Sequence, residues 1–120
     1  MADNNVCEIP RWQQLKRLLN NRSPAEFRVA LADTPNAVLI DVRTPSEYEA
    51  GHIAGAVNMD YLSYDFWDRI EQLDPDRTYF IYCRTARRSV RTCTLMRNAG
   101  FKKLYHLDGG WNLWSEGLSN

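Results

Sequence analysis

The sequence lacks a long apolar run, and this bears on the class of protein it encodes. No stretch approaches the ~18 consecutive apolar residues that a membrane-spanning helix requires, so we do not expect a membrane protein. The sequence also lacks an excess of either charge, because its 15 acidic residues balance its 15 basic ones. We therefore expect no general nucleic-acid surface and no polybasic membrane surface.

Cysteine is scarce as well. The three cysteines, Cys7, Cys83 and Cys93, show neither the paired spacing of a zinc site nor the density of a disulfide scaffold. We accordingly expect no metal and no other cofactor. The N-terminal residues show no basic start followed by an apolar stretch, so we expect no secretory signal and a cytoplasmic location.

A length of 120 residues suits one domain with one core. Residues 10–19 carry apolar side chains at spacings of three and four, which predicts an amphipathic helix. We assign this helix to an N-terminal extension over residues 1–22, ahead of a main domain over residues 23–120. The order serine, proline, alanine, glutamate at residues 23–26 is typical of a helix start and predicts a helix from about Pro24 towards Ala32.

Two short apolar runs, residues 37–42 and 78–83, are bounded by turn residues and predict buried parallel strands. Further strands are expected near residues 56–58 and 104–107, and further helices near 46–50, 64–73 and 87–99. This alternation predicts an α/β fold, a parallel sheet with helices on both faces. Ligands of such sheets bind just beyond the carboxyl ends of the strands, where Cys83 lies.

Cys83 ends an apolar strand and is followed by a short loop that turns into a helix. Backbone N–H groups and the positive end of the helix dipole converge at such a place. This setting stabilises a thiolate, so we expect Cys83 to be partly or largely ionised at neutral pH and to act as a nucleophile. The same amides suit the outer sulfur of a persulfide or the oxygens of thiosulfate.

Arginines are concentrated directly after this cysteine. Four of them, Arg84, Arg87, Arg88 and Arg91, fall within residues 84–91 and predict a local anion site. A lone cysteine at the end of an apolar strand is often only a small buried hydrophobe, but these arginines favour the functional interpretation. Cys93 in the middle of a helix and Cys7 in the extension have no comparable setting, so we expect both to be non-catalytic.

Three motifs carry a resemblance to a known family. Residues 83–89, CRTARRS, resemble the active-site loop of single-domain rhodaneses. Residues 41–43, 47–48 and 51–58 resemble the upstream signature of that family, and residues 107–111 with Trp114 resemble its C-terminal one. The motifs occur in the family's order, and together with the preceding helix the resemblance covers nearly everything after residue 22.

The resemblance implies a rhodanese-like domain of three layers with a central parallel sheet of about five strands. It also implies a ping-pong sulfurtransferase, in which a sulfane sulfur passes from a small anionic donor such as thiosulfate to Cys83 as a persulfide. The acceptor would be cyanide, a thiol or a protein. The loop residues expected to bind the substrate are Arg84, Thr85, Ala86, Arg87, Arg88 and Ser89. A second interpretation stays open, a non-catalytic or regulatory module that carries sulfur or binds a partner.

The loop departs from two related patterns. Phosphatases related to this family place an arginine six positions after the cysteine, whereas here Arg88 comes one residue earlier and Ser89 occupies that position. The narrower loop suits a sulfur atom better than a phosphoryl group. Ala86 stands where many relatives have glycine, and we expect a strain of ~1 kcal/mol there if the position requires a positive φ.

Charged and aromatic residues near the motifs have structural interpretations as well. Asp41 and Arg43 end a buried strand and are expected to pair, because an unpaired buried charge costs several kcal/mol. This pair either braces the active loop from behind or only stabilises the fold. His52 is expected to be structural, since an ionised cysteine needs no general base. Trp111 and Trp114 are expected to pack in the core after a turn at Gly109 and Gly110.

Overall fold

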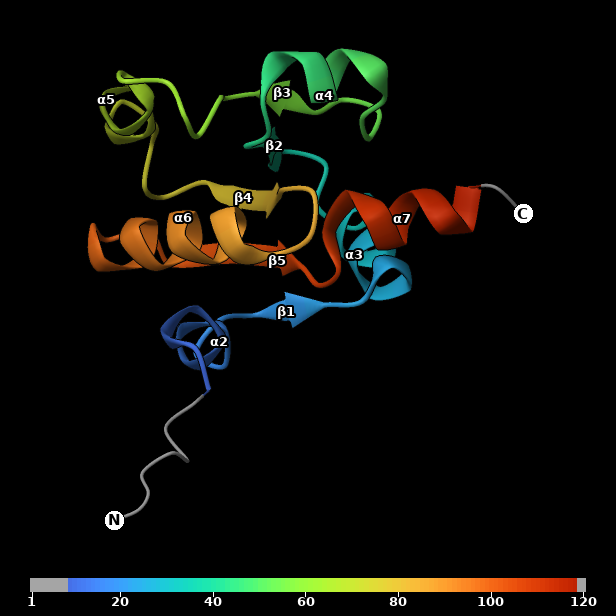
Figure 1. The fold of residues 1–120 in the computed structure, drawn as a ribbon. Coiled ribbons are helices and arrows are strands. Elements are labelled where there is room, and N and C mark those ends of the chain that lie inside the picture. Colours follow the sequence, from blue (N-terminus) through green and yellow to red (C-terminus); the bar gives the residue numbers. More distant parts are fainter. Residues whose placement is uncertain (1–8, 119–120) are drawn as a thin grey trace.

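The computed structural model describes residues 9–118, which form a parallel sheet flanked by helices (Figure 1). The strands are β1 (Asn21–Arg22), β2 (Val38–Asp41), β3 (Val57–Asn58), β4 (Thr78–Tyr82) and β5 (Lys103–Leu107). They form a five-stranded sheet in the order β1-β5-β4-β2-β3, and every neighbouring pair is parallel. The predicted α/β class and strand number are confirmed.

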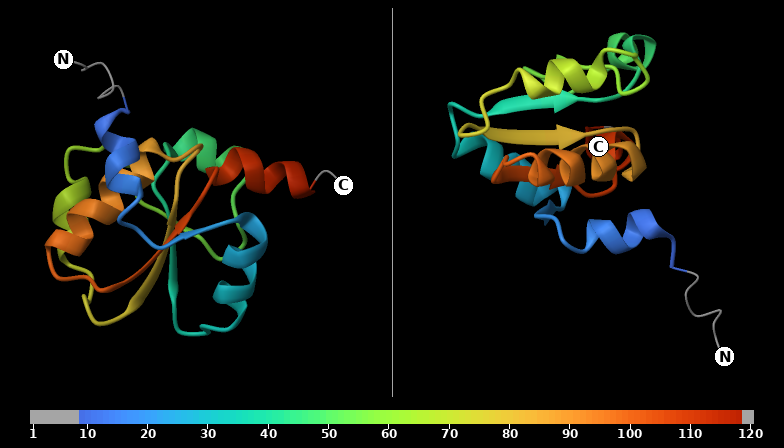
Figure 2. Two further views of the ribbon diagram at one scale, coloured as in Figure 1. Left: turned by 90° about the horizontal axis from the view of Figure 1, so that it is seen from below. Right: turned by 90° about the vertical axis from the view of Figure 1, so that its left-hand side faces the viewer.

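Helices cover both faces of this sheet and give the domain three layers (Figure 2). They are α2 (Arg11–Lys16), α3 (Pro24–Ala32), α4 (Pro45–Ala50), α5 (Phe66–Glu71), α6 (Arg87–Asn98) and α7 (Gly110–Leu118). The left view of Figure 2 shows α2, α5 and α6 on one side of the sheet and α3 and α7 on the other. The two faces therefore have separate cores.

Side chains of β4 alternate between these two cores, as the pleat of a strand requires. Tyr79 and Ile81 pack with Cys83 in the core that includes Met96 of α6, whereas Phe80 and Tyr82 belong to the core beneath α3 and α7. Cys83 directly follows β4 and continues this alternation. Its side chain therefore lies on the α6 side, next to the start of that helix.

Local sequence signals account for several helix ends. Ser23 and Glu26 form a capping box at α3, whose bounds match the prediction. Thr44 and Glu47 form a second capping box at α4, with a proline at the first helical turn. Gly100 follows α6 with φ of 103°, the left-handed conformation that ends a helix at low cost in a glycine.

The N-terminal part of the chain contributes to the sheet. The helix predicted over residues 10–19 is present but shorter, and the chain continues into β1, in which Asn21 pairs with His106 of β5. Cys7, which we expected to be non-catalytic, lies outside the described residues. Among residues 9–118, no helix has the length and apolar character needed to cross a membrane.

Candidate functional site at the loop after strand β4

Cys83 lies at the base of the loop that joins β4 to α6, and it is only 2% exposed. Its Sγ atom accepts a hydrogen bond from the backbone N–H of Ser89 at 3.3 Å and lies 3.2 Å from the Ser89 hydroxyl oxygen. The sulfur therefore faces the first turn of α6. This is the placement that the sequence predicted.

The backbone N–H groups of residues 84–88 have no hydrogen-bond acceptor in the described part of the chain. They run consecutively through the loop and into the start of α6, a helix of 12 residues. Unpaired N–H groups at a helix start form a site for an anion, and the helix dipole adds to the attraction. The loop therefore combines a buried sulfur with free donors around it.

The carbonyl groups of the same loop are held by the start of α7. Cys83 O accepts a hydrogen bond from Trp111 N at 2.8 Å, and Arg84 O accepts one from Asn112 N at 3.0 Å. Gly110 permits this contact, because its φ is +59° and a Cβ atom there would lie 2.5 Å from both Cys83 O and Thr85 O. The sequence interpretation treated Gly110 only as part of a turn, so this close approach was missed.

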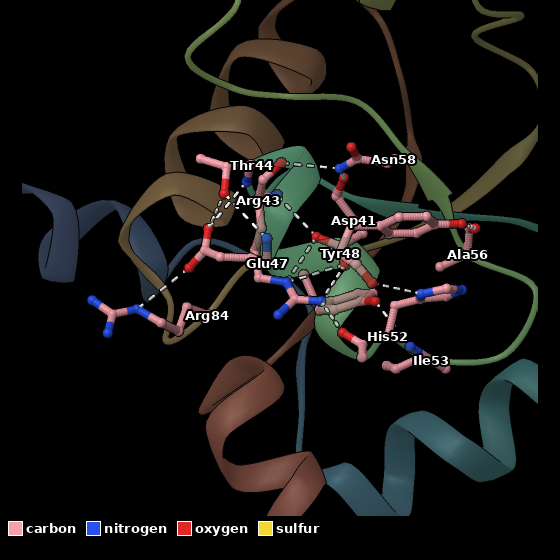
Figure 3. A network of polar contacts seen from close by, with 12 residues as sticks. Asp41, Arg43, Thr44, Glu47, Tyr48, His52, Ile53, Ala56, Asn58 and Arg84 are labelled. Atoms are coloured by element: carbon pink, nitrogen blue, oxygen red, sulfur yellow. Dashed lines mark hydrogen bonds and ion pairs between the residues drawn. The ribbon is translucent and has the colours of Figure 1, made fainter.

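The arginines after Cys83 divide into two groups. Arg84 and Arg88 lie 3.8 Å and 3.5 Å from the carboxylate of Glu47 on α4 (Figure 3, which labels Arg84 and Glu47). Burial opposes the charge of Glu47, but hydrogen bonds from Thr44 and the charge of Arg88 outweigh burial and lower the pKa of this carboxyl group. The loop arginines are thus held beside α4.

The other two arginines, Arg87 and Arg91, face α2. With Arg11 they line a groove of about 290 Å³ between α2 and α6. No ion pair joins any of these three guanidinium groups to another residue among those described. The predicted cluster of positive charge therefore extends from the loop onto one face of α6.

Asp41 and Arg43 form the predicted ion pair behind the loop (Figure 3). Arg43 Nη2 donates to Asp41 Oδ2 at 2.7 Å and to Gly51 O at 2.6 Å, and both side chains are buried. Burial disfavours the charged guanidinium, but its hydrogen bonds to Asp41 and the charge of that carboxylate outweigh burial and raise the pKa of Arg43. The guanidinium also lies 5.0 Å from the ring centre of Trp111. The backbone N–H of Trp111 is the group that donates to Cys83 O.

The strain considered at Ala86 does not arise. Its φ is −162°, and no residue other than glycine has a positive φ within the described range. The alanine methyl group is buried against the loop. The condition for strain, a positive φ at residue 86, is therefore not met.

Neither His52, expected to be structural, nor Cys93, expected to be non-catalytic, has a hydrogen bond to the loop residues 84–89 among those described. His52 is exposed and stacks on Tyr48, with ring centres 3.8 Å apart (Figure 3). Cys93 is 1% exposed, and burial raises the pKa of its thiol well above the ordinary value. Among residues 9–118, no group of three or more histidine, cysteine, aspartate or glutamate side chains is placed to hold a metal ion.

Sequence reasoning missed His106, whose Nε2 lies 2.7 Å from the hydroxyl oxygen of Ser89. This histidine is 1% exposed in β5. Burial, with the nearby charge of Lys16 as a smaller cause, lowers its pKa to about 4. A lone histidine between Tyr105 and Leu107, near the end of β5, is the only sequence signal that marks it.

The burial of His106 predicts that stability depends on pH. An unfolded histidine has a pKa near 6.5 and the folded one about 4, so the unfolded state binds more protons between these values. The free energy of unfolding should therefore fall by about 3 kcal/mol from this group as the pH drops from 7 to 4. Urea unfolding at several pH values measures this. His106→Phe should remove that part of the dependence, His52→Phe should keep it, and equal pH dependence in all three proteins would contradict the assignment.

Fold and loop together define a class of α/β domain in which a buried cysteine at a strand end lies beneath the free N–H groups of a helix start. Within this class, the chain belongs to the rhodanese-like domain family, because the sequence model of that family matches residues 13–117.

Known relatives agree with this placement. The chain is 34% identical over 109 residues to the uncharacterized protein YqhL of Bacillus subtilis, covering 91% of this chain and 82% of YqhL. It is 32% identical over 93 residues to the thiosulfate sulfurtransferase GlpE of Pseudomonas putida, covering 78% of this chain and 83% of GlpE. A rhodanese-related protein of Thermoplasma volcanium superposes with a TM-score of 0.71 at 21% identity, covering 82% and 92% of the two chains, and supports the fold alone.

Proposed function

We propose that the chain is a sulfurtransferase that moves a sulfane sulfur from a small anionic donor such as thiosulfate to a thiophilic acceptor, through a persulfide on Cys83. One observation carries this proposal: the nearly buried Cys83 Sγ lies at the base of a loop whose N–H groups, from residue 84 to 88, have no acceptor in the described chain. Family membership and the name of GlpE support the same reaction class.

In the first half-reaction, the Cys83 thiolate attacks the outer sulfur of thiosulfate. A sulfur–sulfur bond forms to Sγ, the sulfur–sulfur bond of the donor breaks, and sulfite leaves with the electron pair. In the second, cyanide or a thiolate attacks the outer sulfur of the persulfide, and the Cys83 thiolate leaves. In each step the attacking group supplies the electron pair of the new bond and the leaving group takes the pair of the broken bond, so neither step needs an external oxidant or reductant.

The residues of the loop have distinct parts in this scheme. The backbone N–H groups from Arg84 to Arg88 supply donors for the outer sulfur, which carries the negative charge of the persulfide, while the Ser89 N–H donates to Sγ. The guanidinium groups of Arg84 and Arg88 make the electrostatic potential at the loop more positive, and the nearby carboxylate of Glu47 partly offsets it. Asp41 and Arg43 act as positioning residues, because Arg43 contacts Trp111 and Trp111 N holds Cys83 O.

Incubation with thiosulfate is expected to raise the intact mass of the protein by one sulfur atom, located on Cys83. Cyanide should remove the sulfur and release thiocyanate. Cys83→Ser should abolish loading, whereas Cys93→Ala should keep it, because that thiol is buried and un-ionised. Intact-mass and peptide mass spectrometry measure these outcomes.

Loading that persists in Cys83→Ser would contradict the assignment. If the folded wild-type protein takes up sulfur from none of the donors tested, the partner-binding module would be favoured instead. Hydrolysis of an aryl phosphate serves as the control for reaction class. None is expected, because Ser89 occupies the position of the phosphatase arginine and lies against Cys83 Sγ.

A further inference from the structure

A chain of short polar contacts leads from Cys83 through the sheet to the N-terminal strand. Sγ lies 3.2 Å from Ser89 Oγ, Ser89 Oγ lies 2.7 Å from His106 Nε2, and His106 Nδ1 lies 2.8 Å from Asn21 Oδ1. These residues come from the end of β4, from α6, from β5 and from β1. The sulfur-transfer steps described above make no use of His106 or Asn21.

The direction of the hydrogen bonds follows from Asn21. Its Nδ2 donates to Lys16 O at 2.8 Å and to Leu19 O at 3.3 Å, so its Oδ1 is the atom turned towards His106. An amide oxygen only accepts, so Nδ1 of His106 carries the proton. Because the ring is buried and neutral at pH 7, its Nε2 has a free lone pair.

The charged and titratable groups near the ring do not alter this arrangement. Burial is the main reason why the ring is neutral, and Lys16 of α2 adds to it. Asp108 after β5 and the carbonyl of Ala86 favour a charged ring but are outweighed, and Lys16 and Asp108 pair with each other. From α6, Cys93 lines the same small cavity as His106, and its buried thiol is neutral. Ser89 is therefore hydrogen-bonded to a neutral His106 ring.

The hydroxyl proton of Ser89 has two acceptors, and both lead away from Cys83. His106 Nε2 lies at 2.7 Å and Ala86 O at 2.9 Å. If the hydroxyl turned towards sulfur, Nε2 would be left buried without a donor, which is costly. Ser89 Oγ therefore presents its lone pairs to Sγ, and within the described chain the Ser89 backbone N–H is left as the donor to the sulfur.

This arrangement acts differently on the two forms of the cysteine. In the thiolate the negative charge is on Sγ, which faces the Ser89 lone pairs at 3.2 Å. In the persulfide the charge is mainly on the outer sulfur, and Sγ is a neutral bridging atom. An oxygen lone pair beside Sγ therefore penalises the thiolate and not the persulfide.

We propose that His106 and Asn21 are positioning residues that hold the Ser89 hydroxyl proton away from Cys83, and that they thereby favour the persulfide-loaded protein over the free thiolate. The proposal rests on the function proposed above and adds a determinant of how long sulfur stays bound. It also gives the N-terminal segment a part in the site, because Asn21 of β1 and the carbonyl of Lys16 set the orientation of His106.

The test compares wild type, Ser89→Ala, His106→Phe and the double variant. The pH at which half of Cys83 reacts with iodoacetamide is measured in each. His106→Phe removes one of the two acceptors that compete with the thiolate for the Ser89 hydroxyl proton. The other, Ala86 O, is a neutral carbonyl that already accepts from Val90 N at 2.8 Å, so the hydroxyl should turn to the charged sulfur. The midpoint should then fall by about one pH unit, a tenfold change in the thiolate-to-thiol ratio. Ser89→Ala alone should give a midpoint equal to or below that of wild type. Added to His106→Phe, the same substitution should raise the midpoint.

The same proteins are equilibrated with a fixed ratio of thiosulfate to sulfite, and the loaded fraction is read by intact mass. At a pH above all the measured midpoints, where the free cysteine is thiolate, His106→Phe should lower the loaded-to-free ratio about tenfold, in line with the midpoint shift. His52→Phe, the matched histidine control, should change neither measurement. If wild type fails to load at all, the proposed function fails, while the alkylation midpoints still report the orientation of the hydroxyl.

Nitrogen NMR of the His106 ring in wild type needs no variant and covers the case in which His106→Phe does not fold. The proposal requires a proton on Nδ1 and none on Nε2 at pH 7. A proton on Nε2, or a Ser89→Ala substitution that raises the midpoint equally in wild type and in His106→Phe, would overturn it.

Discussion

Gly110→Ala is expected to lower the rate of sulfur transfer at least ~100-fold, because displacing a reacting group by about 1 Å has an effect of this size. A Cβ at residue 110 would lie 2.5 Å from Cys83 O and from Thr85 O, and 2.7 Å from Arg84 C. All three are backbone atoms, which cannot rotate away as a flexible side chain can. Either the loop or the start of α7 must therefore move, and the bond from Trp111 N to Cys83 O is lost.

The rate of thiocyanate formation and the free energy of unfolding in urea measure this effect. Gly117→Ala is the matched control in the same helix, since a Cβ there meets no atom within 4 Å and the φ is not positive. It should leave the rate unchanged and stabilise the fold slightly, by up to about 1 kcal/mol. A Gly110→Ala protein that transfers sulfur at the wild-type rate would show that α7 does not set the position of the loop.

Asp41→Asn is expected to lower the free energy of unfolding by about 3–5 kcal/mol, because it leaves the charge of Arg43 buried without a counter-ion. Arg43 is 2% exposed and Asp41 is fully buried, so water cannot replace the carboxylate. The guanidinium also donates to Gly51 O and lies over the ring of Trp111, so its displacement should disturb the loop as well.

Urea unfolding at pH 7 measures the loss of stability, and thiosulfate loading measures the effect on the loop. The double variant Asp41→Asn with Arg43→Met is the control, since it removes both charges. It should be more stable than Asp41→Asn alone, because no unpaired charge remains buried. If the single variant is as stable as wild type, or if the double variant is the weaker of the two, the pair does not have the role described here.

Much of the architecture could be predicted because its signals are local. The residues that cap α3 and α4 lie within four positions of each other, and both helices begin where serine or threonine precedes proline. The apolar runs that became β2 and β4 are buried on both faces, so they stand out from their surroundings. The position of Cys83 between such a strand and an arginine-rich helix start could also be predicted, because all three are adjacent in the sequence.

Other features of the fold and site depend on contacts between distant residues. β1 is only Asn21 and Arg22, two polar residues with no strand pattern, and they form a strand because the edge of β5 offers them hydrogen bonds. The strand order also brings Gly110 against the carbonyl groups of the loop and His106 against Ser89.

The sequence alone therefore determined the α/β class, the main helices and strands, and the position of Cys83, the proposed nucleophile, beside a group of arginines. Each of these follows from residues a few positions apart, whose periodicity and capping act within one helix or strand. Only the tertiary structure decided which groups surround the sulfur. Asn21 and His106 lie on strands far apart in the sequence and are linked to Cys83 through Ser89. Their hydrogen-bond directions follow from burial and from partners that no local pattern specifies.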